Sequence, residues 1–147
     1  MEFGPINLWN FVIVTIMLVP NIIYALKNPN QKNSCTNKCM NILEQIGRYA
    51  CIILMILPLC FDQMKFGFSS FSIFLIYGIG NVVLLLAYLL IWVMYSNESH
   101  AWRAISLAVI PTCIFLLTGL TLEHWLLVGA AVIFGTSHIY ITQKNNR

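Results

Sequence analysis

The chain has 147 residues, of which 59% are apolar and only 9% are charged, and its formal net charge is +3. Soluble domains carry roughly 25% charged residues, so this composition excludes an ordinary soluble enzyme and a disordered chain. The mean hydropathy of +0.80 indicates a chain whose solvent is lipid. The net charge is too small to favour a nucleic acid as a partner.

The charged residues are spaced so widely that five segments could cross a membrane as helices. About 20 residues, each rising about 1.5 Å, cover a hydrocarbon core of about 30 Å. The second segment reaches this length only if Glu44 and Arg48 lie in its first two turns. We therefore predict an all-α integral membrane bundle of five transmembrane helices that forms a single domain over residues 1–147. The expected spans, in chain order, are 6–26, 41–61, 70–95, 101–120 and 123–142.

The basic residues predict the orientation of the bundle, because cytoplasmic loops collect Lys and Arg. If the N-terminus is outside and the C-terminus is cytoplasmic, seven basic residues fall inside and only Lys65 falls outside. The tryptophans agree, with Trp9 and Trp125 near the outer boundary and Trp92 and Trp102 near the inner one, where amphipathic rings favour the headgroup level. The inside set is Lys27, Lys32, Lys38, Arg48, Arg103, Lys144 and Arg147.

Three of the expected spans contain a proline, at Pro20, Pro58 and Pro111. Each proline removes a backbone hydrogen bond and kinks its helix, which membrane proteins tolerate where neighbouring groups satisfy the freed carbonyl. The kinks either shape the helices or mark a hinge beside a cavity. Pro20 is the best hinge candidate, because the adjacent Asn21 could bond the carbonyl released one turn earlier.

On the expected orientation, five polar residues fall in the inner third of the bilayer: Asn21, Glu44, Gln45, Arg48 and His138. Glu44 and Arg48 are four residues apart with the acid first, which is the favourable order for a helical ion pair. Charged residues inside a span usually pair, face the bundle and mark function, although this pair could instead anchor the helix by reaching the headgroups. His138 is either a packing residue or the titratable member of a cluster with Glu44 and Arg48.

Small residues indicate close helix packing in the third and fifth spans. They occur in Gly78-Ile-Gly-Asn81, in Gly129-Ala-Ala and in Gly135-Thr-Ser137. Asn81 is the sole strongly polar residue deep in the third span, so it either bonds across a helix contact or belongs to the site. The candidate ligand-binding residues are thus Asn21, Glu44, Arg48, Asn81 and His138.

The chain offers little catalytic or metal chemistry. Glu44 and His138 could act as an acid–base pair on a lipid, but no catalytic motif supports an enzyme. Cys35 and Cys39 lie in a loop expected in the reducing cytoplasm, where a disulfide is not expected. With His100 they would supply at most three zinc ligands, so we expect neither a metal nor a cofactor.

Three stretches of the chain resemble a family of small, uncharacterised multi-span membrane proteins of Gram-positive bacteria. The resemblance implies a bacterial cytoplasmic membrane and assigns no functional residues. The stretches are Ile42-Leu-Glu-Gln-Ile-Gly-Arg48, Val109-Ile-Pro-Thr-Cys-Ile-Phe-Leu-Leu and Ala130-Ala-Val-Ile-Phe-Gly135.

The expected function is therefore the binding or transport of a small molecule or ion through a polar cluster in the inner half of the bundle. An alternative is a non-catalytic accessory or immunity subunit of a larger membrane complex, and a third is a lipid-modifying enzyme. The expected partners are membrane lipids, a further copy of the chain or another membrane protein, and no nucleic acid. Anionic headgroups would meet the basic inner surface of Lys27, Lys32, Lys38, Lys144 and Arg147.

Overall fold

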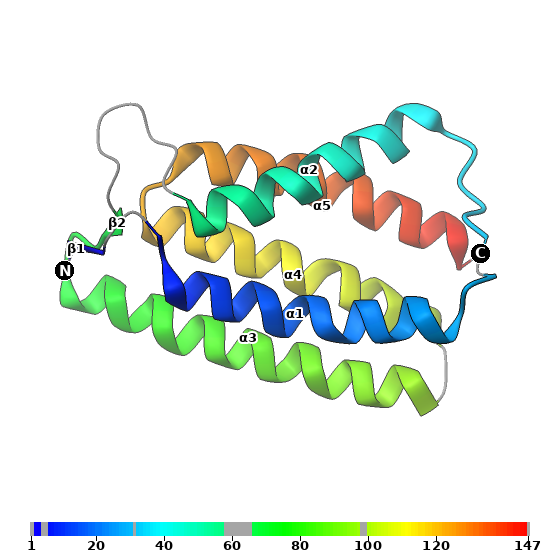
Figure 1. The fold of residues 1–147 in the computed structure, drawn as a ribbon, viewed down its shortest axis with the longest axis horizontal. Helices are drawn as coiled ribbons and strands as arrows, with labels where there is room; N and C mark the ends of the chain where they lie inside the picture. The colour runs from blue at the N-terminus through cyan, green and yellow to red at the C-terminus, as the bar shows by residue number, and fades with distance from the viewer. Residues whose placement is uncertain (1, 4–5, 31, 58–65, 98–99, 147) are drawn as a thin grey trace.

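Five helices that alternate in direction build the part of the chain that the computed structural model describes, which is residues 2–3, 6–30, 32–57, 66–97 and 100–146 (Figure 1). All five are long and apolar enough to cross a membrane. Two short antiparallel strands, β1 (Glu2–Phe3) and β2 (Phe66–Gly67), pair near the start of α3. The helices are α1 (Leu8–Lys27), α2 (Lys38–Ile56), α3 (Phe71–Asn97), α4 (Ala101–Thr121) and α5 (Trp125–Asn145).

The predicted number and order of helices are confirmed, and the helix ends differ by a few residues. α2 begins at Lys38, three residues before the predicted start, because the side chain of Asn37 caps it by accepting a hydrogen bond from the Met40 amide at 3.3 Å. The helix ends at Ile56. The predicted continuation over 58–61, with the expected kink at Pro58, lies outside the described residues.

A tight turn separates α4 from α5 and delays the start of α5 to Trp125. Glu123 has a φ of 54°, in the left-handed region that a side chain disfavours. The His124 amide bonds the Gly119 carbonyl at 2.8 Å, and the Glu123 amide bonds the Leu120 carbonyl at 3.3 Å. These two hydrogen bonds form a Schellman motif, in which glycine normally occupies the position of Glu123.

Replacing Glu123 with glycine is expected to stabilise the protein by about 1 kcal/mol, because glycine adopts a positive φ without steric cost. The matched control is Glu123→Ala, which removes the same charge but keeps a Cβ. Reversible unfolding in mixed detergent micelles, followed by helical circular dichroism, gives the free energy of unfolding. An equal gain in both variants would mean that the charge, and not the backbone, is responsible.

The helices differ in how deeply they are buried, and α4 lies at the centre. Within its membrane-length window 56% of the residues are buried, against 17% in α1 and in α3. The exposed faces of α1 and α3 carry large apolar side chains such as Phe11 and Leu90, as expected for surfaces in contact with lipid.

Two glycines allow neighbouring helices to approach closely. A Cβ on Gly47 of α2 would lie 2.8 Å from the backbone nitrogen and Cα of Phe134 on α5. A Cβ on Gly135 would lie 2.3 Å from Cγ2 of Thr112 on α4. The predicted packing role is thus confirmed for Gly135 and for Ala130 and Ala131, which are buried, whereas the one for Gly129 itself is wrong, because a Cβ there would meet open space. The contact at Gly47 brings the polar face of α2 against α5.

Candidate functional site

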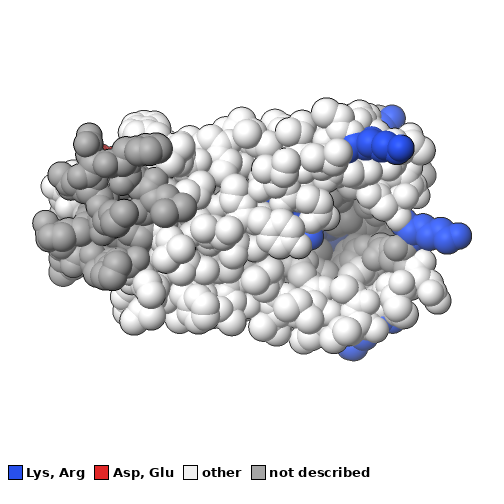
Figure 2. All heavy atoms as spheres, turned by 45° about the horizontal axis from the view of Figure 1, so that its top comes forward, with Lys and Arg blue, Asp and Glu red and all other residues white. Residues whose placement is uncertain are grey.

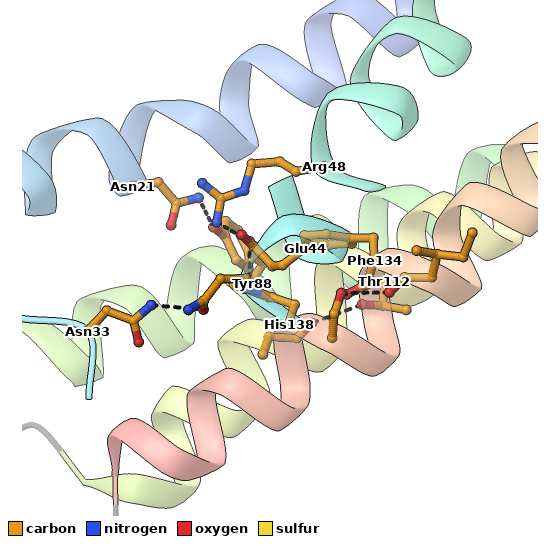
Figure 3. Close-up of polar contacts among 12 residues, drawn as sticks. Asn21, Asn33, Glu44, Arg48, Tyr88, Thr112, Phe134 and His138 are labelled. Carbon is orange, nitrogen blue, oxygen red and sulfur yellow. Dashed lines mark hydrogen bonds and ion pairs between the residues drawn. The ribbon is translucent and has the colours of Figure 1, made fainter. Parts of the chain in front are cut away.

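The carboxylate of Glu44 is the centre of a polar cluster between α2 and α5 (Figure 3). Glu44 is only 4% exposed, and its Oε1 accepts a hydrogen bond from Nη2 of Arg48, one turn later on α2. The same oxygen lies 3.1 Å from Nδ1 of His138 on α5. The close contact at Gly47 explains this convergence, because it leaves little distance between the two helices.

The structure thus brings together three residues that the sequence singles out, Glu44 and Arg48 from α2 and His138 from the distant α5. The imidazole of His138 also stacks on the ring of Phe134, one turn earlier on α5, with the ring centres 4.8 Å apart. The side chain of Arg48 is 41% exposed and that of His138 is 26% exposed, so both remain accessible while Glu44 does not.

Asn21 of α1 lies near Arg48 (Figure 3) and hydrogen-bonds the buried Tyr88 of α3. Its Nδ2 donates to the Tyr88 hydroxyl at 2.7 Å and to the Met17 carbonyl at 2.9 Å. The expectation that Asn21 satisfies the carbonyl freed by Pro20 is wrong, because a proline at position 20 frees the carbonyl of Ile16, four residues earlier. The amide of Asn21 instead fixes the orientation of Tyr88.

Residues of this cluster line two cavities. The inner cavity, of about 240 Å³, lies within the bundle. The vestibule, of about 500 Å³, lies at the end where α2 starts and α5 finishes. Arg48 and His138 line both cavities, while Glu44 lines the vestibule. The inner cavity is otherwise lined by Val14, Met17, Leu18, Asn21, Ile52, Tyr88, Leu107, Pro111, Phe115 and Phe134. The vestibule is otherwise lined by Lys32, Asn33, Asn41, Gln45, Ile141, Thr142 and Asn145.

The vestibule opens at the basic end of the bundle, which we define by the described residues Lys27, Lys32, Lys38, Arg103 and Lys144. Figure 2 shows Lys and Arg side chains gathered at this end, with a hollow in the surface between two of them. A ligand that enters from this end therefore meets positive charge first and the cluster afterwards.

Asn81 lies apart from this cluster, in a second polar network. Its Nδ2 donates to the Tyr77 carbonyl at 2.9 Å, and its Oδ1 accepts from the Thr118 hydroxyl of α4 at 3.3 Å. The Tyr77 hydroxyl donates to Oδ1 of Asn10 at 2.6 Å, and Nδ2 of Asn10 donates to the Met55 carbonyl at 2.8 Å. The network thus connects α1, α2, α3 and α4, which favours the packing interpretation of Asn81.

Sequence reasoning missed Tyr88 and Tyr77, the hydroxyls that organise the two networks. Each lies within a run of apolar residues, and each has its side-chain partner 67 positions away in the chain. The spacing of Tyr77 four residues before Asn81 was a local signal that the two share a helix face. No comparable signal pointed to Tyr88.

Among the described residues there is no group of three or more His, Cys, Asp or Glu side chains that could hold a metal ion. Comparison of the chain with models of protein families, with curated proteins and with solved structures gave no match.

Proposed function

We propose that the chain is a multi-pass protein of a bacterial cytoplasmic membrane that binds a small molecule or ion at Glu44, Arg48 and His138, and moves it toward or from the cytoplasm. The observation that carries the proposal is that Arg48 and His138 line both cavities. A ligand in either cavity is therefore within reach of these two side chains. Charged groups placed inside a membrane segment and facing the bundle commonly mark such pathways.

A pair that merely anchored α2 to the headgroups would extend outward into the interface. Arg48 instead lies against the inner cavity together with Asn21 and Tyr88, as Figure 3 shows. Glu44 is buried against α5 and not directed at lipid. This geometry supports a site over an anchor.

Native mass spectrometry of the protein purified in mild detergent tests the proposal. We expect a bound non-protein species in the unmodified chain and its loss in Arg48→Leu. The matched control is Lys27→Gln, which removes a basic-end charge away from both cavities. A bound species that is retained in Arg48→Leu would contradict the proposal. The absence of any bound species from the unmodified chain would contradict it as well. A second protein retained at fixed stoichiometry in all three samples would indicate an accessory subunit.

The proposed orientation places the basic end in the cytoplasm, in accord with the preference of basic residues for that side. It can be checked with single-cysteine variants in a chain whose other cysteines are replaced by alanine. Cys39 is exposed at the basic end, and Ser69 is exposed before α3 at the other end. In intact cells a membrane-impermeant maleimide should label Ser69→Cys, and it should label Cys39 only after permeabilisation. The reverse pattern would place the basic end outside.

A further inference from the structure

The wall shared by the two cavities favours a particular class of ligand. We propose that the ligand is a small organic anion with an apolar tail. The anion binds to Arg48, and its binding is coupled to the uptake of one proton by His138. This inference rests on the proposed function and names the chemistry of its ligand.

The two charged side chains of the cluster differ in their capacity for a ligand. Glu44 is 4% exposed and already faces two donors, Arg48 and His138, so a cation would have to displace one of them. The guanidinium of Arg48 has five N–H donors. Nη2 donates to Glu44, and the other N–H groups of the guanidinium remain available to a ligand in the two cavities that Arg48 lines. Carboxylate and phosphate groups match such a guanidinium fork.

The remaining walls of the inner cavity accommodate an apolar tail. Beside Arg48, its lining is largely aliphatic and aromatic, with Ile52 from α2, Val14 from α1 and Phe115 from α4. Its volume of about 240 Å³ lies below the roughly 300–1,000 Å³ of sites for drug-sized ligands. A short alkyl carboxylate, with its head at Arg48 and its tail inward, matches both the size and the distribution of polarity.

The uptake of a proton follows from charge balance at the inner cavity. Among the described residues that line the inner cavity, the one permanent positive charge is that of Arg48, and Glu44 already neutralises it, so an anion bound there would leave an uncompensated negative charge, which is costly away from water. His138, whose Nδ1 lies 3.1 Å from Oε1 of Glu44, is the imidazole that can take up this proton. The charged and titratable groups that line these cavities with His138 are Glu44 and Arg48 from α2, Lys32 from the α1–α2 loop and Tyr88 from α3. The described lining residues from α4 are apolar.

Isothermal titration calorimetry with hexanoate and hexylammonium, in phosphatidylcholine nanodiscs, distinguishes an anion site from a cation site. We expect hexanoate to bind the unmodified chain and hexylammonium not to bind. Arg48→Leu should weaken hexanoate binding at least about tenfold, as loss of a charge-assisted hydrogen bond does. Arg48→Lys should weaken it less, and Lys27→Gln should leave it unchanged. The contrast between the two probes in the unmodified chain remains decisive even if Arg48→Leu does not fold.

Proton uptake on binding is measured by repeating the hexanoate titration near pH 7.5 in imidazole and in Tris, which are cationic buffers with different ionisation enthalpies. The observed heat should differ between buffers in proportion to proton uptake of up to one per anion. His138→Gln keeps a polar side chain beside Glu44 but cannot take up the proton. In this variant the buffer dependence should disappear and hexanoate should bind more weakly. Equal heats in the two buffers for the unmodified chain would overturn the coupling.

The source of the anion is resolved by changing the lipid. If phosphatidylglycerol in the nanodisc abolishes hexanoate binding, a lipid headgroup is the occupant, and if binding persists, the anion comes from solution. Either result supports the anion site. If hexylammonium binds and its binding is lost in Glu44→Gln, the ligand is a cation. That result would contradict the proposed anion site but not the proposed function. Absence of binding by either probe overturns the anion site. The absence of a bound species in native mass spectrometry as well would also remove the proposed function.

Discussion

Replacing Gly47 with alanine is expected to destabilise the protein by about 3 kcal/mol, toward the upper end of the effect of overpacking. The added Cβ would lie 2.8 Å from the backbone of Phe134, which cannot move aside as a flexible side chain can. α2 and α5 would have to separate, and Glu44 would move away from His138. The loss is measured as the free energy of unfolding in mixed detergent micelles.

The matched control for this substitution is Gly129→Ala, on α5, where the added methyl group would meet open space. Both substitutions replace a helical glycine with the best helix former, which by itself stabilises a helix by up to about 1 kcal/mol. Gly129→Ala should therefore be neutral or stabilising. If Gly47→Ala behaved in the same way, the close approach of α2 and α5 would not exist in the folded protein.

Replacing Arg48 with leucine is expected to destabilise the protein by about 2 kcal/mol at pH 8. Removing one partner of a fully buried ion pair costs about 3–5 kcal/mol. The 41% exposure of the Arg48 side chain argues for a smaller loss. Arg48→Lys preserves the positive charge and should lose less than half as much. Equal melting temperatures for the two variants would argue against a specific pair between Glu44 and Arg48.

The loss of unfolding free energy caused by Arg48→Leu should also depend on pH, and it should be smaller at lower pH. Without the guanidinium, the buried carboxylate of Glu44 is compensated only when a proton is taken up on Glu44 or His138. A lower pH supplies that proton, so the difference in unfolding free energy from the unmodified chain should shrink as the pH is lowered from 8. A difference that grows as the pH falls would mean that Glu44 is not the charge left uncompensated.

The sequence was informative about the spans because charge is excluded from lipid, so the gaps between charges mark the helices directly. It also predicted the pairing of Glu44 with Arg48, since positions four apart share a helix face. It placed His138 at the same depth, which allowed but did not establish contact. The face that α5 presents to α2 depends on the contact between Gly47 and Phe134. This contact joins two helices, so the residue pattern of a single helix does not predict it.

The position of Asn81 shows the limit of reasoning from depth and polarity alone. The sequence grouped it with the other polar residues, whereas the structure bonds it to the Tyr77 carbonyl and the Thr118 hydroxyl. Its partners come partly from another helix, and their choice depends on how the helices are rotated about their axes. Tyr88 was missed for the same reason, because its hydroxyl has a role only once Asn21 of α1 lies opposite.

The network through Asn10 and Tyr77 has a consequence for how related chains can diverge. The Asn10 side chain donates to Met55 and accepts from Tyr77, so its two polar groups are both engaged in the buried interior. Losing one partner leaves a buried polar atom unsatisfied at a cost of about 1–3 kcal/mol, while exchanging both partners for apolar residues can be nearly neutral. Such an exchange at positions 10 and 77 would still leave the buried backbone carbonyl of Met55 without its donor, so both positions are expected to stay polar in descendants of this sequence.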